Sequence, residues 1–428
     1  MKKLLMLGTS MSSSDMVDTA RQMGCYTIVT DNLPPEQSRA KLDADEYWMI
    51  DTKDIDALEE KCREEKIDAV FAGVSEFNLD RVKELTKRLN LPCYIEDEPW
   101  KYARNKHAFK RKCREIGIPT VEEYVLSDPP QKEEMEGIQY PVVVKPTDGT
   151  GNKGLSICSN DEELTEGCRK ARSACENNDI IVERYITGEE SWNIYYVAEN
   201  EFRPGCRARA FKQPGYPSFL YSLIITAMED SREYKEQLDE KCVELFRSIG
   251  CTKGMAWIQM IRDNEGNYYA LEMAQRLSAG TSSFVEKQAK GLNSIKWLLD
   301  TALGIEHTAS MLPVLAEPPY EIAYCACFLF AERAGIVSHI EFDKLEKDRF
   351  HVSPLVTEGD KVAAYRLIAR IAFCVHSADE LCDTLRYINE NVKILDDQGE
   401  NMYIQYSDYG TLYERNKGLF LSSRETGN

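Results

Sequence analysis

A glycine-rich loop between two strand-like segments constrains the fold of this chain more than any other feature. Residues 141–157 read PVVVKPTDGTGNKGLSI, in which a β-branched run ends at Lys145 and a second apolar run begins at Leu155. Two such runs around a glycine-rich turn predict a β-hairpin. Its glycines let backbone N–H groups approach phosphate oxygens without obstruction from a Cβ atom. No GK[ST] signature opens a helix here, so the loop is not of the Walker A type.

The charges and glycines of this hairpin favour a flap that closes over phosphate groups. The glycines are Gly149, Gly151 and Gly154, while Lys145 and Lys153 place positive charge at the two ends of the loop. Glycine hairpins are more often plain turns. The phosphate-binding interpretation therefore depends on the segments that precede and follow the hairpin.

Length and charge exclude several classes of protein. The 428 residues suffice for two or three domains, and a hydrophobic fraction of 43% is ordinary for a globular protein. A formal net charge of −19 argues against a nucleic acid or an anionic membrane as partner, because both select basic surfaces. No apolar run reaches membrane-spanning length. The N-terminal MKKLLMLG is broken too early for a signal peptide and is expected to form a core strand.

The cysteines indicate small buried side chains rather than a disulfide framework. There are 14 of them, scattered along the chain without a CxxC pair. Cys325 and Cys327 share one strand face, but no histidine or cysteine pair complements them, so a metal site is not expected there. A cytoplasmic location follows from this pattern.

The first part of the chain alternates between strand and helix, which predicts a parallel, doubly wound sheet. The first turn, GTSMSSSD, lacks GxGxxG, and this disfavours a dinucleotide site. Asp31 ends the second strand where an NAD-binding acid would stand. A nicotinamide-dependent oxidoreductase is an alternative that rests on this residue alone. The expected strands are residues 2–8, 26–31, 46–51, 68–74 and 93–96, and the expected helices lie near 14–23, 54–66 and 78–90.

A lysine at the start of a predicted helix is the first of three further candidate positions. Residues 98–118 are expected to form a helix or a broken helix pair that stops at Gly117, with Asn105 capping its second half. Lys106 then lies in the first turn, where the helix dipole disfavours a cation. The sequence around Lys106 alone favours a solvent-exposed lysine over one that faces an anionic ligand.

Two later segments carry acidic and amide groups. In DIIVERYITGEE, residues 179–190, a strand runs into Glu183, and Glu190 follows seven residues later. In residues 255–276, two strands around Asp-Asn-Glu-Gly form a hairpin, on which Glu272 and Arg276 project from one face and Gln259 comes from the other strand. A carboxylate and an amide on adjacent strands suit Mg²⁺, which takes few protein ligands beside phosphates and water. The alternative is a solvent-exposed hairpin face.

Taken in order, these segments resemble the ATP-grasp superfamily, and most of all the carbamoyl-phosphate synthase large-chain halves and the phosphoribosylglycinamide synthetase-like carboxylate–amine ligases. The resemblance covers residues 1 to about 305. It implies an α/β and α+β architecture with an N-terminal Rossmann-like domain, a mobile lid and a C-terminal α+β region. The implied ranges are 1–97 for the N-terminal domain, 98–305 for the ATP-grasp core with the lid at about 120–183, and 306–428 for the C-terminal region and tail.

The resemblance also implies the residues of a nucleotide site. Lys106 and Lys145 would contact the phosphates, and the flap would close over them. Glu190 would bind the ribose, and Gln259 and Glu272 would hold Mg²⁺, with Mn²⁺ as the alternative ion. Arg276 would hold the acyl-phosphate or the substrate carboxylate, which suits its bidentate fork. The adenine slot would be lined by Glu183, Arg184, Tyr185 and Ile186.

The chain departs from the superfamily pattern at one metal ligand. Related enzymes often carry Glu-x-Asn-x-Arg, and the asparagine position here is Ala274. A bidentate Glu272 or a water molecule would then complete the coordination.

The implied activity is ATP- and Mg²⁺-dependent ligation of a carboxylate to an amine through an acyl-phosphate, with release of ADP and phosphate. A phosphotransferase of the same fold and a nucleotide-binding module without turnover remain alternatives. The expected partners are the two small-molecule substrates, with no nucleic acid and no membrane, and a homodimer stays open.

Substrate recognition has two candidate positions. Glu76 follows the strand 68–74, at the end where open α/β sheets bind ligands. Arg207, Arg209 and Lys212 form a basic cluster in RARAFKQPGY. That cluster fits an anionic substrate and a solvated surface equally well.

Overall fold

The computed structural model of the chain forms two compact units, each built from segments far apart in the sequence. It describes residues 1–9, 13–148, 154–175, 178–217, 220–226, 234–278, 293–312 and 322–420. Unit 1 comprises Met1–Tyr94, Arg203–Tyr234 and Leu277–Asn428, and unit 2 comprises Ile95–Phe202 and Lys235–Arg276. The three ranges inferred from the resemblance stay a prediction.

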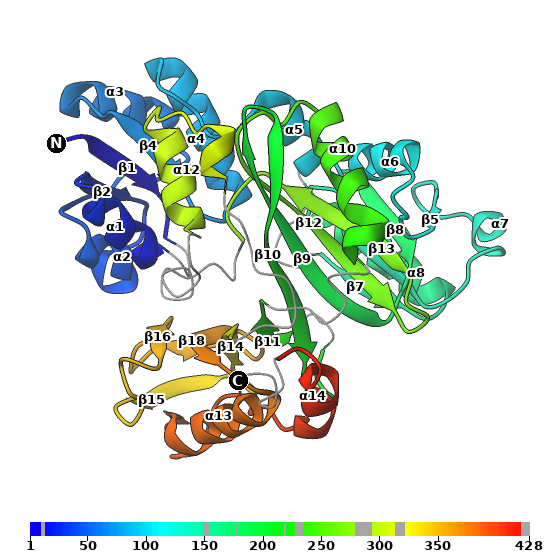
Figure 1. Cartoon of the computed structure of the whole chain (residues 1–428). Coiled ribbons are helices and arrows are strands. Elements are labelled where there is room, and N and C mark those ends of the chain that lie inside the picture. Colours follow the sequence, from blue (N-terminus) through cyan, green and yellow to red (C-terminus); the bar gives the residue numbers. More distant parts are fainter. Residues whose placement is uncertain are drawn as a thin grey trace, which may run out of the picture. The chain divides into compact units, whose positions relative to one another are not determined.

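The start of unit 1 is the predicted parallel sheet, and its strand order is β3-β2-β1-β4 (Figure 1). Caps delimit two of its helices, because the Asp54 and Ser75 side chains accept hydrogen bonds from backbone N–H groups of the first turn. The elements are β1 Lys3–Leu7, α1 Ser13–Gln22, β2 Tyr26–Thr30, η1 Pro35–Gln37, α2 Arg39–Asp43, β3 Glu46–Trp48, α3 Ile55–Glu65, β4 Ala69–Ala72 and α4 Glu76–Leu89.

The fifth strand predicted at residues 93–96 is wrong. This segment is irregular, and its buried Tyr94 replaces the strand by hydrogen bonds from its side chain to β4. The Tyr94 hydroxyl donates to the carbonyl of Ala72 at 2.7 Å and accepts from the N–H of Ala72 at 3.1 Å. The end of β4 is thus satisfied by one side chain, and no ladder forms.

The rest of unit 1 contains the antiparallel strands β10-β11-β14-β18-β16 of a longer sheet, a small sheet in the order β17-β15-β19, and the helices α12, α13 and α14, of which the last two contribute to the core around these strands. Residues up to 420 belong to its core, which includes Leu412, Leu419 and Phe420. The chain is therefore packed into this core as far as Phe420. The elements are β10 Glu201–Lys212, whose first residues lie in unit 2, β11 Tyr221–Ile225, α12 Ser294–Ala302, η3 Ala309–Met311, β14 Ala323–Phe330, β15 Gly335–Glu341, β16 His351–Pro354, β17 Lys361–Val362, β18 Leu367–Val375, α13 Ala378–Asn391, β19 Lys393–Asp396 and α14 Tyr409–Asn416.

Unit 2 begins with the broken helix pair and a four-stranded antiparallel sheet, called the lid sheet here, in the order β5-β8-β6-β7. The predicted flap hairpin is confirmed as β6 and β7, and α8 packs on the sheet through Leu164, Cys168 and Ala171. The elements are α5 Asp97–Ala103, α6 Lys106–Ile116, β5 Glu123–Tyr124, α7 Lys132–Met135, β6 Val142–Pro146, β7 Ser156–Cys158, α8 Asp161–Ser173 and β8 Ile180–Arg184.

The second sheet of unit 2, called the β12 sheet here, consists of three long antiparallel strands in the order β13-β12-β9 (Figure 1). One helical segment packs on it through the rings of Tyr195 and Phe246, whose centres are 5.4 Å apart. The Tyr195 hydroxyl also donates to the Asp239 carboxylate at 2.6 Å. The elements are β9 Gly188–Ala198, η2 Lys235–Asp239, α10 Glu240–Ser248, β12 Gly254–Asp263 and β13 Tyr268–Ala274.

Candidate functional site

A β-bulge sets the register of the acidic groups on the β12 sheet. The register shifts between Gln259 and Met260, so that Gln259 pairs directly with Glu272 across β12 and β13. On the other side Gln259 pairs with Trp192, and Glu190 lies two residues before Trp192 on β9. Residues directly opposite each other share a face, so Glu190, Gln259 and Glu272 all project from one side of the sheet. The Gln259 Nε2 donates to the Glu190 Oε2 at 2.6 Å.

Lys106 faces this acidic group. The local sequence alone favours a solvent-exposed lysine at this position, and the structure differs. The Asn105 side chain caps α6 by accepting from the N–H of Ala108 at 2.8 Å, which fixes where the helix begins. Lys106 is buried, its Nζ lies 3.6 Å from the Glu272 Oε2, and it donates to the carbonyl of Thr147 at 3.3 Å. The unfavourable position at a helix N-terminus is thus offset by a carboxylate and a carbonyl.

On the lid sheet, a buried carboxylate lies between two lysines. Glu183 stands on β8, where it pairs in register with Val143 on β6 and Glu123 on β5. Its Oε2 lies 2.8 Å from the Nζ of Lys145, and its Oε1 contacts the Nζ of Lys110. The Glu183 and Lys110 side chains are 3% and 0% exposed, whereas the Lys145 side chain is 17% exposed. Lys110 therefore completes an ion-pair cluster around Glu183.

Burial and neighbouring charges lower the pKa of both lysines. Desolvation, and then the charge of Lys106, lower the pKa of Lys145 to about 8, while Glu272 and Glu190 oppose this shift. Desolvation, and then the charge of Lys145, hold the pKa of Lys110 well below its ordinary value. Electrostatic interaction thus links Lys145 of the lid sheet with Glu272 and Glu190 of the β12 sheet. The predicted phosphate, ribose and metal residues are brought together in one place.

Arg276 follows the end of β13 and stacks on an aromatic ring. Its guanidinium carbon lies 4.9 Å from the centre of the Trp257 ring. Trp257 is buried, and it pairs directly with Ala274 across the two strands. The small side chain at position 274, where related enzymes often carry asparagine, therefore stands opposite a large ring. Trp257 lies on the same face of the hairpin as Gln259 and Glu272, so Arg276 contacts that face.

The hinge between the two sheets is held by backbone hydrogen bonds. The N–H of Arg184 donates to the carbonyl of Glu122 at 3.0 Å, and the N–H of Tyr185 donates to the carbonyl of Pro141 at 2.9 Å. Ile186 lies in the short irregular stretch before β9. At the start of β9, a Cβ atom on Gly188 would lie 2.0 Å from the carbonyl oxygen of Arg262. Only glycine allows this close approach of two backbones.

The tip of the flap lies outside the described residues. Gly149, Gly151 and Lys153 belong to this part, so their predicted contact with phosphates stays a prediction. Gly154 is described, with a φ of +79°, and a Cβ atom there would lie 2.7 Å from the Cβ of Ala174. This position requires glycine for its backbone conformation and for its close packing.

The residues predicted for substrate recognition lie in unit 1. Glu76 is the first residue of α4, directly after the Ser75 cap and close to the carboxyl end of β4. Lys212 lies with its Nζ 5.7 Å from the centre of the Tyr221 ring. For both, a contact with substrate stays a prediction.

Arg209 contacts the C-terminal end of α14, and its contact with a substrate stays a prediction. It is buried, and its Nη2 donates to the carbonyl of Arg415 at 3.0 Å and to the Oδ1 of Asn416 at 3.1 Å. A cation at the last carbonyls of α14 is a common way to complete a helix C-terminus. Arg209 is thus no part of a solvated face, and the binding of an anionic substrate by the cluster stays a prediction.

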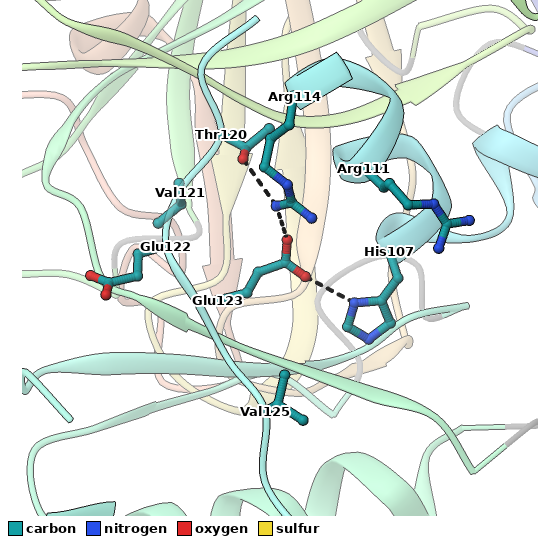
Figure 2. A pocket seen from close by; sticks show the side chains of 8 residues that line it. All are labelled: His107, Arg111, Arg114, Thr120, Val121, Glu122, Glu123 and Val125. Carbon is teal, nitrogen blue, oxygen red and sulfur yellow. Dashed lines mark hydrogen bonds and ion pairs between the residues drawn. The ribbon is translucent and has the colours of Figure 1, made fainter. Parts of the chain in front are cut away.

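A pocket of about 510 Å³ lies beside α6 on unit 2, outside the cluster around Glu183 (Figure 2). One wall is a closed ion-pair group: Glu123 lies 2.9 Å from the Nδ1 of His107 and 2.5 Å from the Nη1 of Arg114. These hydrogen bonds overcome the effect of burial and lower the pKa of Glu123 to about 2, and Glu123 raises the pKa of His107. Arg111 and Val125 also line the pocket. The charges of Glu123, His107 and Arg114 on this wall of the pocket thus largely neutralise one another.

Metal and membrane features are limited in the part of the chain that the structure describes. Within these residues, no group of three or more His, Cys, Asp and Glu side chains could hold a metal ion by itself. Gln259 and Glu272 form a smaller oxygen donor pair, which fits an ion that takes its remaining ligands from phosphates and water. Among the described helices, none is both long enough and apolar enough to cross a membrane.

Comparison with known proteins identifies the fold of this chain. Residues 105–201 match the family model described as carbamoyl-phosphate synthase L chain, ATP binding domain. The biotin carboxylase domain of 2-oxoglutarate carboxylase from Hydrogenobacter thermophilus superposes with a TM-score of 0.75 and 19% identity, over 92% of this chain and 91% of that chain. The L-amino acid ligase from Bacillus licheniformis superposes with a TM-score of 0.75 and 19% identity, over 93% and 99% of the two chains. The chain has the ATP-grasp fold.

Curated ATP-grasp relatives are similar over part of the chain. The 2-oxoglutarate carboxylase small subunit of Hydrogenobacter thermophilus is 27% identical over 47% of this chain and 43% of the relative. A formate-dependent phosphoribosylglycinamide formyltransferase of Sulfurisphaera tokodaii is 25% identical over 43% of this chain and 47% of the relative. The chain thus spans less than half of the length of these relatives. The resemblance inferred from the sequence is confirmed at the level of fold.

Asp31, on which the oxidoreductase alternative rests, is engaged inside its own domain. It is buried, its Oδ1 lies 2.7 Å from the Nζ of Lys41, and its Oδ2 accepts from the Thr9 hydroxyl at 2.5 Å. A ribose-binding acid at this position would have to give up both contacts. The ATP-grasp fold and this ion pair leave that alternative without support.

Proposed function

We propose that this ATP-grasp protein is an ATP- and Mg²⁺-dependent ligase that joins a carboxylate to an amine through an acyl-phosphate. The observation that carries the proposal is the convergence of Lys106 and Lys145 with Glu190, Gln259 and Glu272 in unit 2. Phosphoryl transfer between two anions needs cations that neutralise the phosphates and oxygen ligands that hold the metal. Both kinds of group meet at this place.

The nucleotide would bind to the residues already brought together. Lys106 and Lys145 would neutralise the phosphates, with the glycine flap covering them. Glu183, Arg184, Tyr185 and Ile186 would line the adenine slot. In that hinge the N–H groups of Arg184 and Tyr185 already donate within the lid. Glu190, now held by the Gln259 amide at 2.6 Å, would turn to accept from the ribose hydroxyls.

Mg²⁺ would be held by Gln259 and Glu272, and it would supply charge neutralisation at the β- and γ-phosphates. The direct pairing of these two residues places an amide and a carboxylate side by side, which suits this ion. The Glu272 carboxylate is about one third exposed and thus accessible, with a side-chain exposure of 36%. Ala274 offers no ligand, so Glu272 would have to bind through both of its oxygens or share the ion with water.

Arg276 would orient the acid during the two chemical steps. In the first step, an oxygen of the carboxylate attacks the γ-phosphorus, the bond to the β-phosphate oxygen breaks, and ADP leaves. In the second step, the amine nitrogen attacks the acyl carbon, the bond to the phosphate oxygen breaks, and phosphate leaves with the amine proton lost to solvent. The guanidinium fork would hold the carboxylate and then the acyl-phosphate. The stack on Trp257 at 4.9 Å holds this side chain in place.

Assembly and location are proposed at a coarser level. The related biotin carboxylase domain of Hydrogenobacter thermophilus is described as a dimer, which supports a homodimer for this chain. A cytoplasmic location fits the cysteines, because all those whose side chains the structure describes are free thiols.

A screen of ADP release over pairs of carboxylates and amines tests the proposal, with mass spectrometry of the joined product. We expect ADP release that requires both substrates and one equivalent of joined product per ADP. ADP release with a phosphorylated product and no need for an amine would indicate a phosphotransferase instead. Tight ATP binding without turnover for any pair would indicate a nucleotide-binding module.

A further inference from the structure

The carboxylate of Glu183 holds two lysines whose surroundings differ sharply. Its Oε1 contacts Lys110, whose side chain is 0% exposed, and its Oε2 lies 2.8 Å from Lys145, whose side chain is 17% exposed. Lys145 stands on β6 directly before the flap, at the edge where a ligand can reach it. Lys110 is enclosed and cannot reach a ligand. One carboxylate thus has one accessible cation and one enclosed cation.

We propose that Lys110 is a positioning residue that remains the counterion of Glu183 when Lys145 turns from Glu183 to the nucleotide. This inference rests on the proposed function, in which Lys145 contacts the phosphates. Without Lys110, the departure of Lys145 would leave a buried carboxylate unpaired, and breaking a buried ion pair in this way is strongly unfavourable. Lys145 would then stay on Glu183, and the nucleotide would lose a cation.

The backbone around both partners is fixed, which suits a resident counterion. Lys110 stands in the second turn of α6, whose start is capped by Asn105 and whose end is closed by Gly117 in the left-handed conformation. Phe109 and Cys113 are buried beside it and hold the helix. Glu183 stands on the inner strand β8, paired with strands on both sides. Neither group needs to move when Lys145 does.

The helix also divides its cations between the two sheets of unit 2. Lys106 faces Glu272 of the β12 sheet, at 3.6 Å, and Lys110, one turn later, faces Glu183 of the lid sheet. Residues four apart on a helix lie on the same side, so one face of α6 supplies both. Lys106 donates to the carbonyl of Thr147, and its ion-pair partner Glu272 is 36% exposed, so a ligand can approach this pair. Lys106 and Lys110 therefore have different tasks despite their spacing.

The test measures binding of Mg·ATP by isothermal titration, and steady-state KM and kcat, for wild type, Lys110→Met and Lys110→Arg. We expect Lys110→Met to weaken ATP binding about tenfold or more, with a much smaller change in kcat, because the buried carboxylate then competes for Lys145. Lys110→Arg keeps the charge and should recover part of the affinity. Lys112→Met, on the same helix and paired with Glu115 at its surface, is the matched control and should leave ATP binding unchanged.

A second comparison separates the counterion role from damage to the fold. In a Glu183→Gln background the buried carboxylate charge is absent, so adding Lys110→Met should change ATP affinity less than twofold. This comparison also stands if Lys110→Met alone fails to fold. An equal loss of affinity in both backgrounds, or wild-type affinity in the folded Lys110→Met variant, would overturn the inference. Wild-type protein that binds no ATP would instead overturn the proposed function together with it.

Discussion

The two sheets of unit 2 contribute opposite charge to the candidate site. The lid sheet presents Lys145 beside a buried Glu183 that already has a second lysine, so its local balance is positive. The β12 sheet presents the carboxylates of Glu190 and Glu272 on either side of Gln259, with Lys106 near Glu272 and Arg276 over Trp257 beyond the end of β13, so carboxylates predominate around Gln259. The difference indicates a division of work, in which the lid sheet receives phosphates and the β12 sheet receives the metal ion. Each prediction below tests one side of this division.

The largest loss of turnover is expected on removal of the accessible charge of either sheet, which is Lys145 on the lid sheet and Glu272 on the β12 sheet. Lys145→Ala and Glu272→Gln should each lower turnover by roughly 100-fold to 1,000-fold, because each removes charge that the transition state needs. Both variants should fold normally, since each retains a neighbouring partner network. Circular dichroism and coupled ADP-release assays measure the two properties. Near-native turnover in either folded variant would remove that sheet from the proposed site.

The next effect concerns the acceptor end of the β12 sheet. Arg276→Ala should lower formation of a hydroxylamine-trapped hydroxamate by about 100-fold, while the Kd of ATP changes little, because this guanidinium serves the carboxylate. Trapping is measured with the correct acid and ATP in the absence of the amine. Trapping at the wild-type level would show that Arg276 does not orient the acid. Arg262→Ala, an arginine on β12 over Tyr268, serves as control.

A smaller effect is expected at the pair formed by Ala274 and Trp257. Ala274→Asn would restore the ligand common in related enzymes, but the new side chain must share space with the buried ring directly opposite. We expect it to lower the free energy of unfolding by about 1–3 kcal/mol, the usual range for overpacking. The double variant Ala274→Asn/Trp257→Thr should recover part of this loss. Chemical denaturation of both proteins provides the measurement, and an unchanged single variant would show that the ring does not fill the space.

The smallest effect is a pH dependence that belongs to the lid sheet. Lys145 has a pKa lowered to about 8, so it carries its charge below that pH and loses it above. The apparent affinity of the free enzyme for ATP should therefore fall about tenfold for each pH unit above 8, once most of Lys145 is neutral. In Lys145→Arg this limb should move beyond the alkaline range, because a guanidinium stays protonated. A limb that is identical in both proteins would assign the titration to another group.

The same pKa has a stability consequence of definite sign. The pKa of Lys145 in the folded chain is lower than its ordinary value of 10.5, so between about pH 8 and 10.5 the unfolded chain binds more protons than the folded chain. The penalty for burying this lysine is complete below pH 8 and is relieved as pH rises toward 10.5. The free energy of unfolding should therefore rise over this window relative to Lys145→Met.

Local patterns were sufficient for the strands, helices and caps that carry the site. The flap hairpin follows from β-branched runs around glycines, and the Asn105 cap follows from its position before an amphipathic helix. The shared face of Glu272 and Arg276 follows from strand alternation. These features depend on neighbours in the sequence, so the sequence contains their cause.

Tertiary contacts decided what the sequence alone did not predict. Lys110 is four residues after Lys106 on the buried side of α6, a spacing that hints at a shared face, but its partner Glu183 is 73 residues away and only the fold brings it near. In the sequence, Arg209 belongs to an apparent basic cluster. In the fold, it donates a hydrogen bond to a carbonyl at the end of α14. Tyr94 ends a predicted strand because its hydroxyl completes β4. In each of these cases a distant backbone or side chain overrides the local pattern.

The close backbone contact at Gly188 has a consequence for exchanging parts of this protein. Because a Cβ atom at position 188 would lie 2.0 Å from the carbonyl oxygen of Arg262, this junction locks β9 to β12 immediately after the hinge. Glu190 stands only two residues after Gly188, so a shift of this junction would move Glu190 out of register with Gln259. A chimaera that receives its lid from a homologue must therefore keep glycine at the graft boundary. The hinge is therefore anchored at its β9 end by a contact that only glycine permits.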